Sequence, residues 1–144
     1  MSICIVVADT SRARIFLAEI GSDDLQEYRD IVHPEARLRE QDLVSDGPGS
    51  GIDSGGHGMH SMGHEDSAHH RQAEEFAREL CSEIDHLRQK DRLHRIYLLA
   101  PPKFLGQLRA AMSKQSAALV SGEIDKNLVT HRIGEIRAHL PRRL

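Results

Sequence analysis

Two short apolar runs, Ile3–Ala8 and Ile96–Ala100, constrain the fold of this chain more than any other feature. Each run is continuous rather than alternating and is rich in branched aliphatic residues, which is typical of a strand buried on both faces. A helical pattern and a long polar segment separate the two runs along the chain. Strands interleaved with helices predict an α/β fold, a mixed β-sheet covered by helices.

The residues after the first run predict two further strands. The segment DTSRARIFL begins with turn-forming residues and then alternates apolar and other residues, which indicates a second strand in a hairpin with the first. In this turn we expect Asp9 to bond to the backbone, and we expect Arg12 and Arg14 to point to solvent. A third strand is predicted at Gln26–Val32, ended by Pro34 because proline lacks a backbone donor.

The middle of the chain divides into a polar segment and a helix. Apolar residues recur at helical spacing from Ala73 to Leu87, which predicts an amphipathic helix at about Ser67 to Gln89. The preceding segment, about 41–66, is rich in Gly, Ser and Asp, shows no periodicity and contains no Lys or Arg. We expect it to be a flexible Gly/His-rich loop, either functional or disordered.

The C-terminal part predicts a helix, a strand and a second helix. Pro101 and Pro102 end the second apolar run, and the apolar residues that follow indicate a short helix with proline at its start. A further strand is predicted at Ala117–Ile124. Thr130 is the expected cap of a last helix. That helix should bury Ile133, Ile136 and Leu140.

Composition bounds the class of protein. The 144 residues are 39% hydrophobic and 28% charged, as expected for one compact domain over residues 1–144. Aromatic residues make up only 3%, which disfavours a surface that stacks unpaired nucleobases. Cys4 and Cys81 lie inside apolar patterns, and we expect both in the core of a protein from a reducing compartment. The chain opens without a basic leader or a long apolar segment, which favours a cytoplasmic protein without a membrane partner.

Charge is divided unevenly along the chain. Residues 1–85 contain 7 Lys/Arg and 18 Asp/Glu, a net charge of −11, whereas residues 86–144 contain 12 and 4, a net charge of +8. Such asymmetry is typical of proteins with an anionic partner such as nucleic acid. The alternative is that the two halves interleave in the fold and neutralise each other.

Four segments then resemble one bacterial family in order: IVVADTSRARIF, AEEFARELCSEI, HRIYLLAPPKFLGQLR and GEIDKNLVTHRIGEIRAHLP. They are similar to the host attachment proteins, which are described as required for attachment to host cells. Through this family the chain also resembles the middle domain of archaeal and eukaryotic class-1 peptide release factors and of Pelota. The resemblance implies an RNase H-like, release-factor middle-domain-like α/β domain whose long helix follows a loop.

In release factors that loop carries Gly-Gly-Gln, which helps water to attack the peptidyl-tRNA ester. The corresponding position in this chain reads Gly55-Gly56-His57, so the glutamine is absent. The segment around it carries five acidic residues and no Lys or Arg, which disfavours a close approach to ribosomal RNA. We therefore assign no catalytic residue and expect a binding protein rather than an enzyme.

The histidines in and after the loop support a second hypothesis. Imidazole binds Zn, Ni and Cu, and the spacing of these histidines is compatible with weak binding of a divalent transition metal rather than a fixed cofactor. Their titration near neutral pH would also allow a response to pH. The candidate ligands are His57, His60, His64, His69 and His70.

Two functional classes follow. The first is a non-enzymatic factor associated with the ribosome or with structured RNA, not with DNA, which uses the basic C-terminal half. Lys103, Arg109 and Lys114 are its candidate phosphate contacts, although their spacing distributes them around a helix. The second is a regulatory or binding module linked to host or surface attachment, responsive to metal or pH through the histidine-rich loop.

Overall fold

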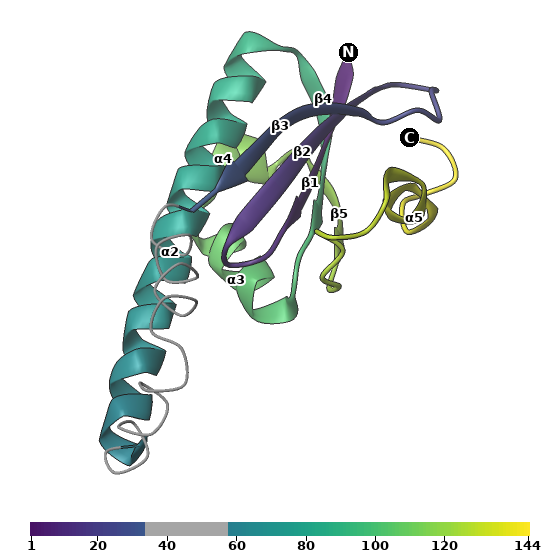
Figure 1. Cartoon of the computed structure of the whole chain (residues 1–144). Helices are drawn as coiled ribbons and strands as arrows, with labels where there is room; N and C mark the ends of the chain where they lie inside the picture. Colours follow the sequence, from purple (N-terminus) through teal and green to yellow (C-terminus); the bar gives the residue numbers. More distant parts are fainter. Residues whose placement is uncertain (34–57) are drawn as a thin grey trace.

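The structure is a computed structural model that describes the backbone of residues 1–33 and 58–144 and the side chains of residues 1–33 and 68–144. Strands and helices alternate after an initial group of strands (Figure 1). In chain order they are β1 (Ser2–Ala8), β2 (Arg12–Glu19), β3 (Gln26–Val32), α2 (Gly58–Lys90), β4 (Leu93–Leu99), α3 (Pro102–Ala111), α4 (Lys114–Ala117), β5 (Val120–Ile124) and α5 (Ile133–Ala138).

The strands form one mixed sheet in the order β3-β2-β1-β4-β5. β2 runs antiparallel to both β1 and β3, whereas β1, β4 and β5 are parallel to one another. Helices connect the parallel strands, as a parallel pair requires. The predicted α/β class, a mixed sheet covered by helices, is confirmed.

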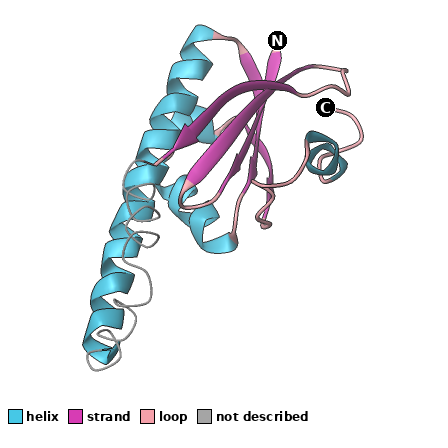
Figure 2. Ribbon diagram, viewed as in Figure 1, coloured by secondary structure: helices cyan, strands magenta, loops and turns pink. Residues whose placement is uncertain are grey.

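Both faces of the sheet are covered (Figure 2). On one face, alternate residues of β1 and β4 such as Val6 and Leu98 pack against the apolar side of α2 and against α3. On the other face, Ile5 and Leu99 pack against the C-terminal segment that contains α5. The two central apolar runs are therefore buried on both sides, as their unbroken pattern predicts.

The first hairpin is confirmed. The Asp9 carboxylate accepts hydrogen bonds from the backbone amides of Ser11 and Arg12 at 2.8 and 2.9 Å. The prediction that Arg14 points to solvent is wrong. Its side chain is only 20% exposed, and its guanidinium donates to the carbonyl oxygens of Val129 and His131. The cause is a tertiary contact, because the segment after β5 lies beside β2 and its backbone carbonyls accept these hydrogen bonds.

Helix α2 begins earlier than predicted, at Gly58 rather than near Ser67, and ends at Lys90. The predicted loop at 41–66 is therefore wrong for residues 58–66, which are helical, and its residues 41–57 lie outside the described part of the chain. The packed portion of the helix begins at Ala73. Once such a helix exists, each added residue gains a backbone hydrogen bond, so it extends into a sequence without apolar periodicity.

The C-terminal elements match the prediction in part. Helix α3 begins at Pro102, as expected. The predicted strand at 117–124 is wrong at its start, because residues 114–117 form α4 and β5 begins only at Val120. The Ser113 side chain caps α4 by accepting a hydrogen bond from the Ser116 amide at 3.2 Å. This local cap outweighs the strand propensity of the residues that follow it.

The last helix is shorter than predicted and starts without the expected cap. Arg132, not Thr130, occupies the N-cap position of α5, and no side chain caps the helix. Ile136 and Leu140 are buried as predicted, but Ile133 is 36% exposed. The helix spans only six residues, Ile133–Ala138, and Ile136 is its buried residue.

Both cysteines are free and buried. Burial raises the pKa of the Cys4 thiol to about 12. Burial, with a smaller contribution from the charge of Asp85, raises the pKa of Cys81 to about 12. Both thiols are therefore protonated and unreactive packing groups at neutral pH. Within the part of the chain that the structure describes, no helix is long and apolar enough to cross a membrane.

Candidate functional site

Four basic residues belong to the elements around the amino end of β4, with Arg95 on the sheet face opposite α2. Lys90 is the last residue of α2, Arg92 lies in the turn that follows, and Arg95 is the third residue of β4. Lys114 is the first residue of α4. Lys90, Arg92 and Lys114 are exposed and Arg95 is half-buried. We name these four residues the amino-end basic surface.

Helix α4 is held beside the last turns of α2 by a network centred on Asp85. Ser113 donates a hydrogen bond to Asp85 Oδ1 at 2.6 Å, and the fully buried Ser116 donates to the same oxygen. Arg88 Nε donates to Ser116 Oγ at 3.2 Å. The network fixes the start of α4 against α2, and it therefore places Lys114 near the end of the longer helix.

The amino-end basic surface has little compensating charge nearby. Among the described residues, none of its four members forms an ion pair, and Asp91 is the one acidic residue within the same turn. The neighbouring carboxylate of Asp85 is engaged by the serine hydroxyls. Exposed cations without partners at a helix end form a surface suited to phosphate groups.

The Asp85 network makes folding stability depend on pH. Burial raises the pKa of this carboxyl, but the hydrogen bonds from Ser113 and Ser116 and the charge of Arg88 outweigh that effect and lower it below its ordinary value. The stabilisation is therefore complete above the pKa of the unfolded chain and is lost as the pH falls through the folded-state pKa.

We predict that Asp85→Asn lowers the free energy of unfolding at pH 7 by about 1–2 kcal/mol, because the amide replaces a charged acceptor of two hydrogen bonds. Urea unfolding at pH 7 and at about pH 3 measures the effect, and the difference between wild type and variant should shrink at the lower pH. An equal difference at both pH values would contradict this role for the ionised carboxylate.

The predicted RNA contacts Lys103, Arg109 and Lys114 are not brought together. Lys103 lies in the first turn of α3, Arg109 in the last turn of the same helix, and Lys114 in α4. Arg109 Nε donates to both carboxylate oxygens of Glu123 at 2.9 Å, so its charge is already paired. Of the three, only Lys114 belongs to the amino-end basic surface.

The loop tip Gly55, Gly56 and His57 lies outside the described residues. Of the other predicted metal ligands, His60 and His64 are in α2, but their side chains are also outside the described part. His69 and His70 are described, and both line one cavity beside α3.

His70 has both ring nitrogens occupied. Nε2 lies 2.8 Å from Glu74 Oε1, and Nδ1 lies 3.4 Å from the Gln107 amide nitrogen. A neutral ring meets both contacts when Nε2 donates to Glu74 and Nδ1 accepts from Gln107, which leaves no lone pair for a metal. In the described residues, no three His, Cys, Asp or Glu side chains lie close enough together to hold a metal ion. Metal binding by the remaining histidines stays a prediction.

The comparisons with known proteins agree with the resemblance seen in the sequence. A family model described as "Protein required for attachment to host cells" matches residues 4–140. The chain belongs to this family. No curated protein matches the chain in sequence.

A solved structure to which this host attachment protein is similar is the archaeal translation termination factor aRF1. The identity is 12% and the TM-score 0.48, and the match covers 96% of this chain and 35% of the archaeal one. The host attachment chain thus spans about a third of the length of the factor it matches. A likeness at this level of identity says nothing about a shared activity.

The sequence analysis missed three members of the amino-end basic surface in this host attachment protein. Lys90, Arg92 and Arg95 lie in the stretch RQKDRLHR, which carries four basic residues within eight positions. This density is the signal that could have identified them. The three residues lie in a helix end, a turn and a strand, so they share no single helical face that the spacing would reveal.

Proposed function

We propose that this host attachment protein is a cytoplasmic, non-enzymatic RNA-binding protein that associates with the ribosome through its amino-end basic surface. The observation that supports the proposal is the group of four cations at the amino end of β4, none of which forms an ion pair with a described residue. RNA phosphates are the partners that such a surface favours, since each contact releases condensed counterions.

The pattern of ion pairs weighs against the alternative in which the two halves of the chain neutralise each other. In the described residues, Arg88 pairs with Asp85 and Arg137 pairs with Asp23, whereas Arg109 pairs with Glu123 inside the basic half. The other nine Lys and Arg residues of positions 86–144 form no ion pair with the described part of the chain. Within the described residues, most of the positive charge of this half is therefore not paired with a carboxylate.

The chemistry of the surface favours the backbone of structured RNA over unpaired bases. The stretches that carry the amino-end basic surface, residues 88–95 and 113–117, contain no Phe, Tyr or Trp, so the surface can bind phosphates but its own segments supply no such ring for stacking. Two free, buried cysteines fit a reducing compartment, which supports a cytoplasmic location.

Cosedimentation of the purified chain with ribosomes tests the proposal. We expect the chain in the ribosome pellet at about 50 mM salt and in the supernatant at about 300 mM, because screening and competing cations weaken phosphate contacts. Absence from the pellet at the lower salt would overturn the proposal. It would favour instead a regulatory module linked to attachment, whose response to metal or pH would depend on the histidines.

A further inference from the structure

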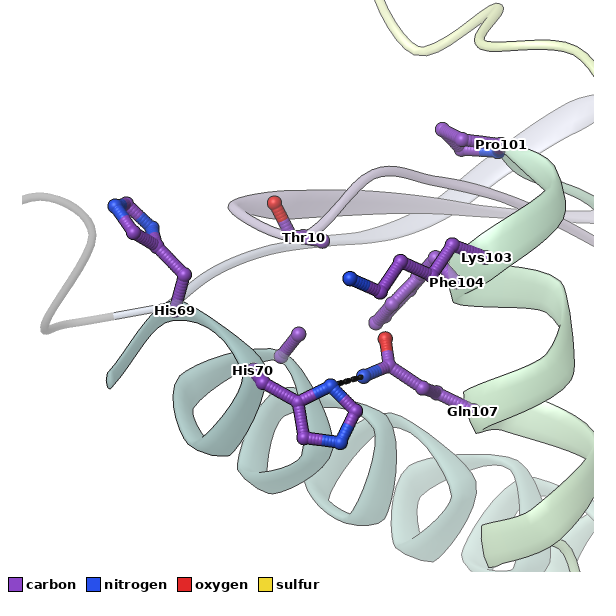
Figure 3. A pocket seen from close by; sticks show the side chains of 8 residues that line it. Thr10, His69, His70, Pro101, Lys103, Phe104 and Gln107 are labelled. Carbon is purple, nitrogen blue, oxygen red and sulfur yellow. Dashed lines mark hydrogen bonds between the residues drawn. The ribbon is translucent and has the colours of Figure 1, made fainter. Parts of the chain in front are cut away.

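A cavity lies at the opposite end of β4 from the amino-end basic surface (Figure 3). Its volume is about 180 Å³, and α2, the turn after β1 and the start of α3 line it. It therefore opens where the parallel strands β1 and β4 have their carboxyl ends. Open α/β sheets bind their ligands at such positions, because the loops after neighbouring strands leave a crevice there.

A single cation extends into this cavity from α3. Figure 3 shows the Lys103 side chain reaching between Thr10 and Gln107, with its ammonium toward the middle of the space. The ammonium forms no ion pair or hydrogen bond with any described residue. Helix α3 also begins here without a side-chain cap, so its first amides add a positive potential.

The acidic side chains near the cavity are already engaged. Asp9, next to Thr10 in the turn, accepts from the backbone amides of Ser11 and Arg12. Glu74 lies against His70 Nε2 at 2.8 Å. Neither carboxylate forms an ion pair with Lys103, so the ammonium stays open to an anionic ligand.

The cavity also offers a hydroxyl and an oriented amide. His70 Nδ1 accepts from Gln107 Nε2, which turns the Gln107 oxygen toward Lys103 (Figure 3). Thr10 also lines the cavity. A ligand that suits this cavity has oxygens that accept hydrogen bonds from Lys103 and Thr10. It also has a hydroxyl that donates to the Gln107 side-chain oxygen.

The floor of the cavity is buried and apolar. Phe104 is 1% exposed and stacks on Phe76 with ring centroids 6.0 Å apart, and Phe76 in turn packs on His33 at 5.4 Å. Ala73 also lines the cavity. A preformed floor keeps the polar groups in position before a ligand arrives, which reduces the entropic cost of binding.

We propose that this cavity binds a phosphate monoester, with Lys103 as the main electrostatic contact and Thr10 as a hydroxyl donor. A lysine beside a helix N-terminus is well suited to phosphate. The volume accommodates a phosphate and a few attached atoms rather than a whole nucleotide. The phosphate can belong to a small metabolite or to the 5′ end of an RNA, since both present the same group. The site goes beyond the proposed function, because it lies at the other end of the sheet from the amino-end basic surface.

Titration of the full chain with inorganic phosphate, followed by NMR of the backbone amides, tests the site. We expect shifts at Thr10, Lys103 and Phe104, and a loss of affinity of at least about tenfold in Lys103→Met, because a charge-assisted hydrogen bond is lost. Lys126→Met is the matched control, since Lys126 is an exposed lysine beside the segment that packs on the other face of the sheet. Its affinity should equal that of the wild type.

Two further measurements complete the test. Thr10→Ala, in an exposed turn, should weaken phosphate binding without loss of the fold. Glycerol phosphate and two RNA oligonucleotides, one with a 5′-phosphate and one with a 5′-hydroxyl, are then compared as competitors of inorganic phosphate. Competition by glycerol phosphate alone identifies a metabolite site, and competition that needs the 5′-phosphate identifies an RNA-end site. Shifts that persist in Lys103→Met, or no shifts in the wild type, would overturn the proposal.

Discussion

Reversal of all four charges of the amino-end basic surface is expected to abolish sedimentation of the chain with ribosomes. The variant carries Lys90→Glu, Arg92→Glu, Arg95→Glu and Lys114→Glu, and it replaces four attractive groups with four that repel phosphates. We expect the affinity to fall by at least about 100-fold at low salt, because phosphate contacts dominate this kind of binding. Cosedimentation at a fixed ribosome concentration measures the loss.

A second variant with the same net charge provides the control. Lys126, Arg132, Arg142 and Arg143 are exposed, lie outside the amino-end basic surface and form no ion pair with a described residue. Their replacement by glutamate changes the charge of the protein by the same amount but leaves the amino end of β4 intact. We expect this variant to retain most of its binding. An equal loss in both variants would show that net charge alone, not this surface, determines association.

Replacement of Arg14 by alanine is expected to lower the free energy of unfolding by about 3 kcal/mol, the largest effect on stability that we predict for an exposed or half-buried charge. Its Nη1 donates to the carbonyls of Val129 and His131 at 3.1 and 2.6 Å, and its Nη2 donates to Glu27 at 3.0 Å. The guanidinium also lies 5.1 Å from the centre of the Phe16 ring. One side chain therefore joins β2, β3 and the segment after β5.

Urea unfolding of Arg14→Ala beside Arg109→Ala checks this expectation. Arg109 also pairs with a glutamate, but its side chain is 57% exposed and contacts no backbone carbonyl in the described residues. Loss of such a surface pair should cost less than about 1 kcal/mol. Arg14→Lys should resemble the alanine variant, because an ammonium cannot reproduce the fork that reaches two carbonyls and a carboxylate. Equal midpoints for Arg14→Ala and Arg109→Ala would contradict the role of Arg14.

The elements that sequence reasoning predicted well are those whose pattern depends on burial. The runs that became β1 and β4 are unbroken because both faces of the central strands are covered, and β3 was predicted with the bounds Gln26–Val32 that the structure has. The buried part of α2 repeats apolar residues every three or four positions because one side of the helix faces the sheet.

The features that escaped prediction depend on contacts between distant segments or on local caps. From its position next to a turn, Arg14 was predicted to be exposed to solvent. Its partners Val129 and His131 lie 115 and 117 positions away in the sequence, so no local pattern indicates them. The start of α4 depends on Ser113 and on the distant carboxylate of Asp85. The amino-end basic surface joins a helix end, a turn, a strand and a second helix, so no single helical or strand period reveals it.

The salt dependence of ribosome binding, measured side by side for the wild-type chain and for Arg92→Ala, tests the central claim most directly. If Arg92 contacts a phosphate, the slope of log affinity against log salt should be less steep in the variant by about 0.7–0.9, the contribution of one released counterion. Arg142→Ala, measured in parallel, should keep the wild-type slope. The same slope for all three proteins, or no binding of the wild type at low salt, would contradict the assignment of this surface to RNA.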